Sequence, residues 1–130
     1  MQLGYTIVYV PDVAASLRFF REAFGLAERF LHESGMYGEL DTGPTTLAFA
    51  AHAMGEANFP AGLVRADTSP QPLGMEIGLV TGDVAAAHAR ALAHGATELA
   101  SPGAKPWGQT VSYLRAPDGT LVELCTAMAG

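Results

Sequence analysis

The chain has 130 residues, a length typical of one domain, and 49% of them are hydrophobic, which is enough for a core. Seven Lys and Arg residues and a net charge of −6 do not provide the basic patch that a nucleic-acid-binding protein needs. No apolar stretch is long enough to span a membrane, and we expect no signal peptide. Cys125 is the single cysteine, so no internal disulfide forms, and we expect a cytoplasmic protein.

An internal repeat is the most informative pattern in the chain. The letters DVAA at residues 12–15 recur at residues 83–86, and an apolar stretch precedes each copy. Each copy predicts a strand followed by a helix, because an N-terminal Asp accepts hydrogen bonds from the first helical turn. Helices are expected over residues 13–24 and 84–94, each followed by a glycine. The side chains predicted to face inward are Val13, Leu17, Phe20 and Phe24 in the first helix and Val84, Ala87, Ala91 and Leu92 in the second.

Three strand-like stretches follow each helix. They cover residues 27–32, 36–41 and 45–51 in the first half and residues 97–100, 110–115 and 120–126 in the second. Both halves therefore follow the order β-α-β-β-β within a single domain of residues 1–130. The halves span about residues 3–52 and 74–127. The connection, residues 53–73, is rich in Pro, Gly and Ala, and it is interpreted as a lid, a dimer contact or a passive linker.

A βαβββ unit that occurs twice resembles the vicinal-oxygen-chelate superfamily of glyoxalases, bleomycin-resistance proteins and extradiol dioxygenases. Residues 12–20 (DVAASLRFF) and 24–26 (FGL) resemble its first-helix signature, and PDG at 117–119 with VEL at 122–124 resembles its last hairpin. PWGQ at 106–109 is similar to a loop of bleomycin-resistance proteins. The resemblance covers about residues 3–127. It implies an α+β fold of two tandem βαβββ modules, curved mixed sheets that form a cup with the helices outside, and a homodimer.

The resemblance also implies a divalent metal in the cup, held by the first and last strands of each half. The repeat places these positions at Tyr5, Ala48, Glu76 and Glu123, where enzymes of the family have His or Gln, Glu, His and Glu. Ala48 has no donor atom, and the phenol of Tyr5 must lose a proton whose ordinary pKa is about 10. We therefore expect no cofactor. Any metal would be a weakly bound Mg²⁺ or Mn²⁺ on Glu76 and Glu123.

The two glutamates have alternative roles. If Glu76 and Glu123 lie close together, their charges repel and the pKa of one carboxyl should rise. Such a pair suits acid–base catalysis, with both as catalytic residues, or it binds a cationic ligand. The alternative without a functional role is that they hold internal water or pair with Arg115.

The alternation of side chains along the strands predicts which face is the cup. The cup face carries the small residues Gly78, Ala48 and Ala50, which would leave a cavity beside Tyr5, Tyr9, Glu76 and Glu123. The bulky residues predicted to pack under the helices are Val8, Val10, Leu47, Phe49, Ile77, Leu79, Val122 and Leu124.

Three further side chains are considered for the site. Trp107 either stacks on a ligand or packs in the core or a dimer interface. His52, at the end of a cup strand, is the histidine most worth following, and Cys125 is expected to be an inert buried thiol.

Two functions follow from these residues. The first is a protein that binds a small molecule in the cup without the tight divalent metal of the family, with Tyr5, Tyr9, Ala48, Glu76, Trp107 and Glu123 as ligand-binding residues. The second is a metal-dependent lyase, isomerase or dioxygenase with an altered ligand set. Neither a nucleic acid nor a membrane is expected as a partner.

Overall fold

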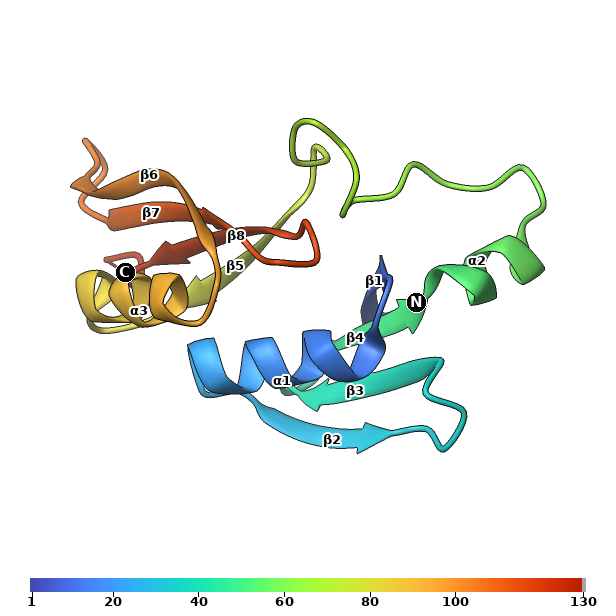
Figure 1. Cartoon of the computed structure of the whole chain (residues 1–130). Helices are drawn as coiled ribbons and strands as arrows, with labels where there is room; N and C mark the ends of the chain where they lie inside the picture. Colours follow the sequence, from blue (N-terminus) through green and yellow to red (C-terminus); the bar gives the residue numbers. More distant parts are fainter. Residues whose placement is uncertain (130) are drawn as a thin grey trace.

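The computed structural model describes residues 1–129 and contains two βαβββ modules joined by a connecting segment (Figure 1). The first module consists of β1 (Tyr5–Val10), α1 (Val13–Phe24), β2 (Ala27–Leu31), β3 (Tyr37–Asp41) and β4 (Thr46–Ala51). The short helix α2 (His52–Asn58) begins the connection. The second module consists of β5 (Glu76–Val80), α3 (Val84–Ala93), β6 (Thr97–Ala104), β7 (Thr110–Arg115) and β8 (Leu121–Cys125). The predicted α+β class with two tandem modules is confirmed.

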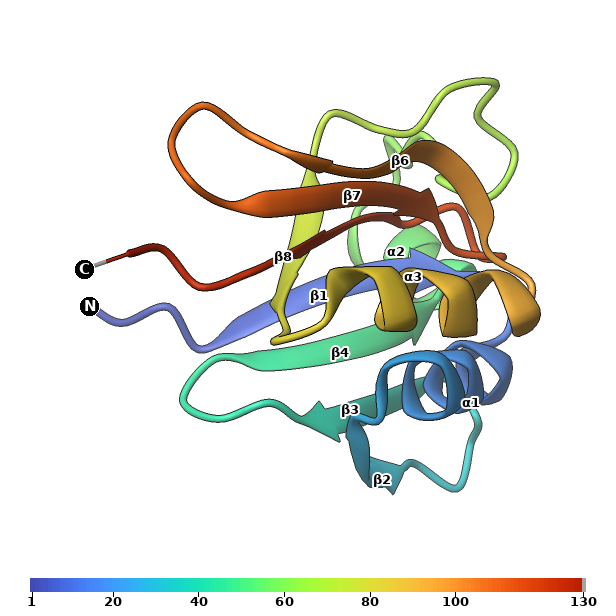
Figure 2. The same ribbon diagram turned by 90° about the vertical axis from the view of Figure 1, so that its left-hand side faces the viewer.

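The two modules share one sheet topology. The strand order is β1-β4-β3-β2 in the first sheet and β5-β8-β7-β6 in the second. In each sheet the first strand runs parallel to the last, and the other neighbours are antiparallel, so both sheets are mixed. Strands β1 and β5 lie at the edges of their sheets. The hairpin between β6 and β7 projects beyond its sheet in both views (Figures 1 and 2).

The predicted helix caps are present. The carboxylates of Asp12 and Asp83 accept hydrogen bonds from the third residue of each helix, at 3.1 Å and 3.0 Å. Gly25 ends α1 with a left-handed backbone (φ 72°), a conformation that a side chain would strain. The repeat in the sequence therefore corresponds to a repeat in local structure.

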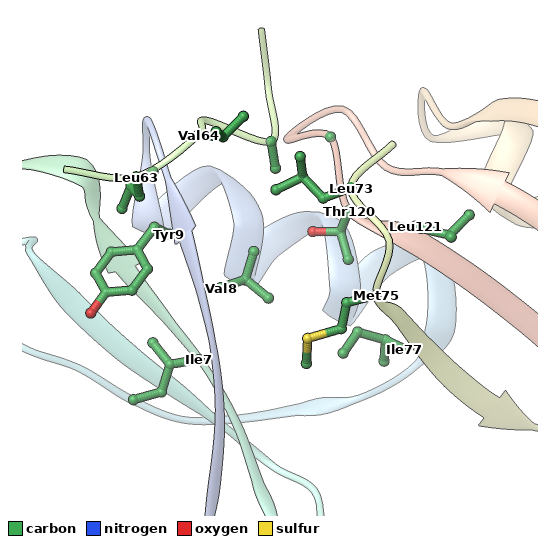
Figure 3. A pocket seen from close by; sticks show the side chains of 12 residues that line it. Ile7, Val8, Tyr9, Leu63, Val64, Leu73, Met75, Ile77, Thr120 and Leu121 are labelled. Atoms are coloured by element: carbon green, nitrogen blue, oxygen red, sulfur yellow. The ribbon is translucent and has the colours of Figure 1, made fainter. Parts of the chain in front are cut away.

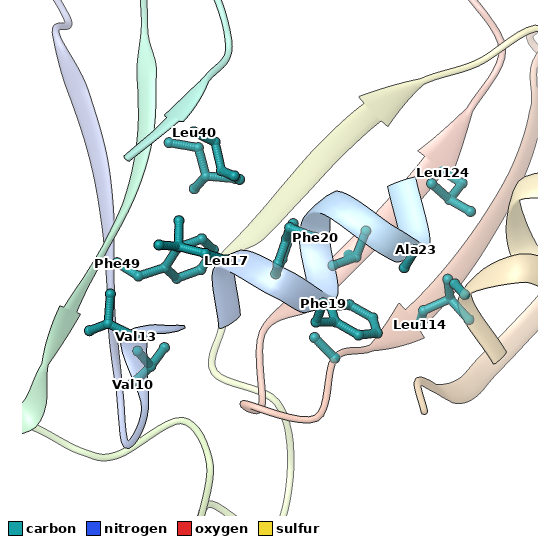
Figure 4. Close-up of a cluster of buried hydrophobic side chains, with 14 of the residues drawn as sticks. Val10, Val13, Leu17, Phe19, Phe20, Ala23, Leu40, Phe49, Leu114 and Leu124 are labelled. Carbon is teal, nitrogen blue, oxygen red and sulfur yellow. The ribbon is translucent and has the colours of Figure 1, made fainter. Parts of the chain in front are cut away.

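One hydrophobic core joins both modules. Helices α1 and α3 contact each other between the two sheets, and each covers the inner face of its own sheet (Figure 1). The core contains most of the bulky strand residues predicted to lie under the helices, and Figure 4 shows Phe49 and Leu124 approaching α1 from opposite sheets. A buried hydrogen bond from Ser16 Oγ to Asp118 Oδ2 (2.7 Å) also ties α1 to the second module.

The prediction that Leu92 of α3 faces inward is wrong. Leu92 is 38% exposed, and His88 is buried in its place. The His88 ring lies 2.9 Å from Ser112 Oγ and 2.7 Å from Glu98 Oε2, which satisfies both of its nitrogens. The spacing of apolar residues along the helix does not predict that His88 is buried, because its hydrogen-bond partners Glu98 and Ser112 lie on β6 and β7. The Ser112 hydroxyl is fully buried beneath α3.

Candidate functional site

The candidate site lies on the outer faces of the sheets, defined here as the faces opposite the helices. Tyr5 is 58% exposed and Ile7 is 41% exposed on the outer face of the first sheet, and Val80 is 67% exposed on that of the second. Because the helices lie between the sheets, the two outer faces point away from each other in one chain. The four positions expected to converge therefore form two separate pairs, Tyr5 with Ala48 and Glu76 with Glu123.

The second module brings Glu76 and Glu123 together. Glu123 lies opposite Gly78 in the β5–β8 ladder, two residues along the strand from Glu76, so both side chains lie on the outer face. Loss of hydration at this surface, followed by the charge and hydrogen bonding of Glu123, raises the pKa of Glu76. The expected rise in the pKa of one carboxyl is present.

Tyr113 completes this carboxylate pair, and sequence reasoning missed it. Its hydroxyl donates a hydrogen bond to Glu123 Oε1 at 2.8 Å from the neighbouring strand β7. This hydrogen bond, together with burial, raises the pKa of Tyr113 to about 12, so the phenol stays protonated and serves as a donor. The sequence alone does not pair these two residues, because only the β7–β8 register shows that Tyr113 lies opposite Glu123.

Cys125 lies beyond Glu123 on the same face. Burial, and then the nearby glutamates, raise the pKa of its thiol. A protonated, buried thiol is a poor nucleophile, which agrees with the expectation that Cys125 is inert.

The first module carries its carboxylate on a different strand. Ala48 lies opposite Glu39 of β3, and Glu39 is buried. Tyr37 donates to Glu39 Oε2 at 2.7 Å, and Arg29 Nη1 donates to Glu39 Oε1 at 3.3 Å and to Thr46 Oγ1 at 3.2 Å. Burial and the Glu39 carboxylate raise the pKa of Tyr37. Glu39 on the neighbouring strand thus supplies the carboxylate that Ala48 lacks, and the guanidinium of Arg29 neutralises this carboxylate.

The strand registers show what takes the place of this cation in the second module. Arg29 occupies a bulge between residues paired with Leu40 and Glu39, and Leu99 occupies the corresponding bulge between residues paired with Leu114 and Tyr113. Leu99 carries no charge to offset a glutamate.

Arg115, which the sequence suggested as a partner for these glutamates, points elsewhere. Its Nη2 atom donates to the carbonyl oxygens of Ala66 and Ser69 in the connection, each at 2.8 Å. Within residues 1–129, no Lys, Arg or His forms an ion pair with Glu76 or Glu123. The interpretation that Arg115 neutralises these glutamates is therefore wrong.

The donor set does not fit the tight metal of the related enzymes. The described part of the chain contains no group of three His, Cys, Asp or Glu side chains placed to hold one ion. Glu76 and Glu123 supply oxygen donors alone, and Ala48 supplies none. A mixed nitrogen and oxygen site is therefore not built by one chain.

The remaining predicted site residues lie apart from the carboxylate pair. Trp107 is 57% exposed in the turn between β6 and β7, where its Nε1 donates to Gln109 Oε1 at 2.8 Å, so it does not belong to the core of the chain. Tyr9 packs edge-to-face on Phe59 of the connection, with ring centroids 5.7 Å apart.

His52 lies where the first module meets the connection and does not contact the carboxylate pair, and its Nε2 has no hydrogen-bond partner. It is buried at the start of α2, with Nε2 3.7 Å from Asp67 Oδ1. Arg65 makes two hydrogen bonds to Asp67, each 3.1 Å long, and these lower the pKa of Asp67.

No helix within residues 1–129 is long and apolar enough to cross a membrane.

Comparison with known proteins agrees with this architecture. The structure resembles a glyoxalase-related enzyme from Fulvimarina pelagi, with a TM-score of 0.82, 23% identity, and coverage of 98% of this chain and 88% of that one. It also resembles a glyoxalase/bleomycin resistance protein/dioxygenase family enzyme from Burkholderia phytofirmans PsJN, with a TM-score of 0.81, 21% identity and coverage of 98% and 100%. A superfamily member from Sphaerobacter thermophilus matches with a TM-score of 0.72, 20% identity and coverage of 98% of both chains.

At these identities the structural matches show the fold alone, and no curated protein matches the sequence. The family assignment comes from the sequence itself, because residues 2–124 match the model of one family. The chain belongs to the glyoxalase/bleomycin resistance protein/dioxygenase superfamily.

Proposed function

We propose that the protein binds a small cationic organic molecule on the outer face of the second module, without a tightly bound divalent metal. The observation that supports this proposal is the Glu76–Glu123 pair, which lies on an exposed sheet face and has no cationic partner within residues 1–129. A protonated amine or amidinium would relieve the repulsion between the two carboxylates, and it would gain charge-assisted hydrogen bonds.

The neighbouring side chains support an organic ligand. Gly78 has open space where a side chain would be, and Leu99 and Val80 expose apolar surface on the same module. The Tyr113 hydroxyl holds Glu123 in place through its 2.8 Å hydrogen bond. The site thus offers a fixed acidic centre and an apolar surround, which suits a cation attached to a flat apolar body.

We further propose that a second copy of the chain completes the site. Each outer face exposes apolar side chains, among them Tyr5, Ile7 and Val80, and a first module from one copy would cover a second module from the other. A twofold arrangement of this kind gives two equivalent cups per homodimer. Val80→Glu should then lower the molar mass measured by light scattering to that of a monomer. A dimer that survives this substitution would count against the interface.

The second candidate function is a metal-dependent lyase, isomerase or dioxygenase with an altered ligand set. The retained carboxylates Glu76 and Glu123 favour it, since a pair that shares a proton can act as general acid and base. Elemental analysis separates the two functions after incubation with Ni²⁺, Zn²⁺, Mn²⁺, Mg²⁺ or Fe²⁺ and desalting. Stoichiometric metal that disappears in Glu123→Ala would favour the enzyme and overturn the proposal.

Binding itself is tested with two matched probes. Benzamidine carries a cation and benzamide is its neutral counterpart, so calorimetric titration with both isolates the contribution of charge. Benzamidine should bind more tightly, and Glu123→Gln should weaken it roughly tenfold, because one charged partner of the hydrogen-bonded cation is lost. Glu33→Gln, an exposed glutamate in the turn after β2, is the control and should change nothing. Equal affinities for benzamide and benzamidine would refute the cationic class.

A further inference from the structure

A pocket lies between β1 and the start of β5, where its lining residues Met75 and Ile77 flank Glu76 along the strand. Its volume is about 240 Å³, and Figure 3 shows Ile7, Tyr9, Met75 and Leu73 around it. Neither Glu76 nor Glu123 lines this pocket, and none of its lining side chains is charged. A cavity of about 150 Å³ is enough to hold a benzene ring, so this pocket has room for a larger molecule.

The connection forms the roof of the pocket and is fixed in place. Leu63, Val64 and Leu73 contribute lining side chains from this segment. The guanidinium of Arg115 holds its backbone through the carbonyl oxygens of Ala66 and Ser69. Gly119 packs so closely on Ala66 that a Cβ atom there would run into the backbone of the connection. The pocket is therefore preformed, and the connection between the modules does more than join them.

One buried polar group of the pocket lining has no hydrogen-bond partner. Thr120 is 6% exposed, and its Oγ1 atom has no hydrogen-bond partner. The Thr120 backbone N–H is satisfied by Asp118 Oδ1 at 3.0 Å, so the hydroxyl alone is left over. In Figure 3 this hydroxyl points into the space between Val8 and Leu73. A buried hydroxyl without a partner costs free energy, and a ligand that bonds to it would recover that cost.

We propose that this pocket binds a small neutral molecule with an apolar body and one oxygen or N–H group that hydrogen-bonds to Thr120 Oγ1. Neutrality follows from the absence of charged lining residues, because a buried charge without a partner would be strongly disfavoured. The ligand needs one polar group because Thr120 is the one buried side chain of the lining that lacks a hydrogen-bond partner. This site is separate from the cation site proposed above, and its existence does not depend on that proposal.

Methyl NMR of the full chain, labelled at Leu, Val, Ile and Met methyls, tests the inference with benzyl alcohol and toluene as probes. Both should shift the methyl signals of Leu63, Leu73 and Met75, and benzyl alcohol should bind more tightly because it reaches the hydroxyl. Thr120→Val should weaken benzyl alcohol three- to tenfold and leave toluene unchanged, the effect of about one hydrogen bond. Since the substitution removes an unsatisfied group, the variant should fold normally.

Three comparisons make the outcome decisive. Thr97→Val, at an exposed threonine of β6, is the matched control and should alter neither probe. Leu73→Trp should fill the pocket and abolish the binding of both probes, whereas Glu123→Gln should leave both intact. The inference is overturned if Thr120→Val weakens the two probes equally or not at all. It is also overturned if the probes shift methyl signals only on the outer faces of the sheets.

Discussion

The two modules share a topology but treat their acidic residues in opposite ways. In the first, Glu39 is buried, and Tyr37 and Arg29 satisfy its carboxylate. In the second, Tyr113 bonds to Glu123 in a similar way, but Leu99 stands where the cation would be and Glu76 adds a further negative charge. The carboxylate on the outer face of the first module is thus neutralised by a cation of the same module. The two carboxylates on the outer face of the second module have no such partner within residues 1–129.

A repeated fold can therefore hold its acidic residues in two different environments. The backbone geometry of the two sheets is nearly equivalent, so the difference lies in a few side chains at matched positions. Where the chain supplies its own cation, the carboxylate contributes to stability. Where it does not, the carboxylate stays without a cationic partner, and this difference is the basis of the cation site proposed above.

Removing the cation of the first module should have the largest effect. Arg29→Leu leaves the buried Glu39 carboxylate without its charged partner, and we expect a loss of about 2 kcal/mol in the free energy of unfolding, discounted because Arg29 is partly exposed. Urea denaturation measures this loss. Arg21→Leu is the control, because the 3.6 Å pair of Arg21 with Glu28 is exposed and should contribute less than about 0.5 kcal/mol. If both variants lose the same stability, Glu39 does not depend on Arg29.

Adding a cation to the second module should make it resemble the first. Leu99→Arg places a guanidinium at the bulge that matches Arg29, so it should compete with a cationic ligand for Glu123. We expect the affinity for benzamidine to fall about fivefold, near 1 kcal/mol, by calorimetric titration. Leu92→Arg, on the solvent side of α3, adds the same charge elsewhere and should have little effect. An equal loss in both variants would mean that net charge alone governs binding.

The smallest expected effect concerns Glu76 and pH. The pKa of Glu76 is raised in the folded protein, so the folded state holds its proton more tightly than the unfolded state does. The contribution of Glu76 to stability should therefore fall as the pH rises from about 4, the ordinary range of a glutamate, through the raised pKa. Glu76→Gln should remove this slope and make the protein more stable at pH 7 by less than about 1 kcal/mol.

Melting temperatures measured from pH 4 to pH 8 provide this test. Glu123→Gln should also flatten the profile, because it removes the charge that faces Glu76. A variant profile parallel to that of the original protein would show that the two carboxylates do not interact.

Much of the fold followed from local patterns. The repeated DVAA, the capping Asp12 and Asp83 and the alternation along the strands predicted both modules and most of the core-facing residues. These features depend on neighbours within a few residues, so a single sequence displays them. Leu92 was misplaced because the competing residue, His88, is buried through partners on β6 and β7 that no helical pattern reveals.

The candidate site was predictable only in part. The repeat located Glu76 and Glu123 and showed that Ala48 lacks a donor atom. It did not reveal Glu39 or Tyr113, because each becomes relevant through the residue opposite it on the next strand. Nor did it reveal the pocket at Thr120, whose walls come from β1, the connection and the start of β5.

The sequence by itself determined the order of elements within both modules, the duplication, the inner and outer faces of each strand and the family, but not the short helix α2. Local hydrogen bonding and the period of two along a strand are written in short stretches of chain. Only the tertiary structure decided that the outer faces diverge, that Arg29 neutralises Glu39 and that Arg115 holds the connection. These outcomes depend on which side chains meet across strands and modules, and packing selects one arrangement from many that the same local pattern allows.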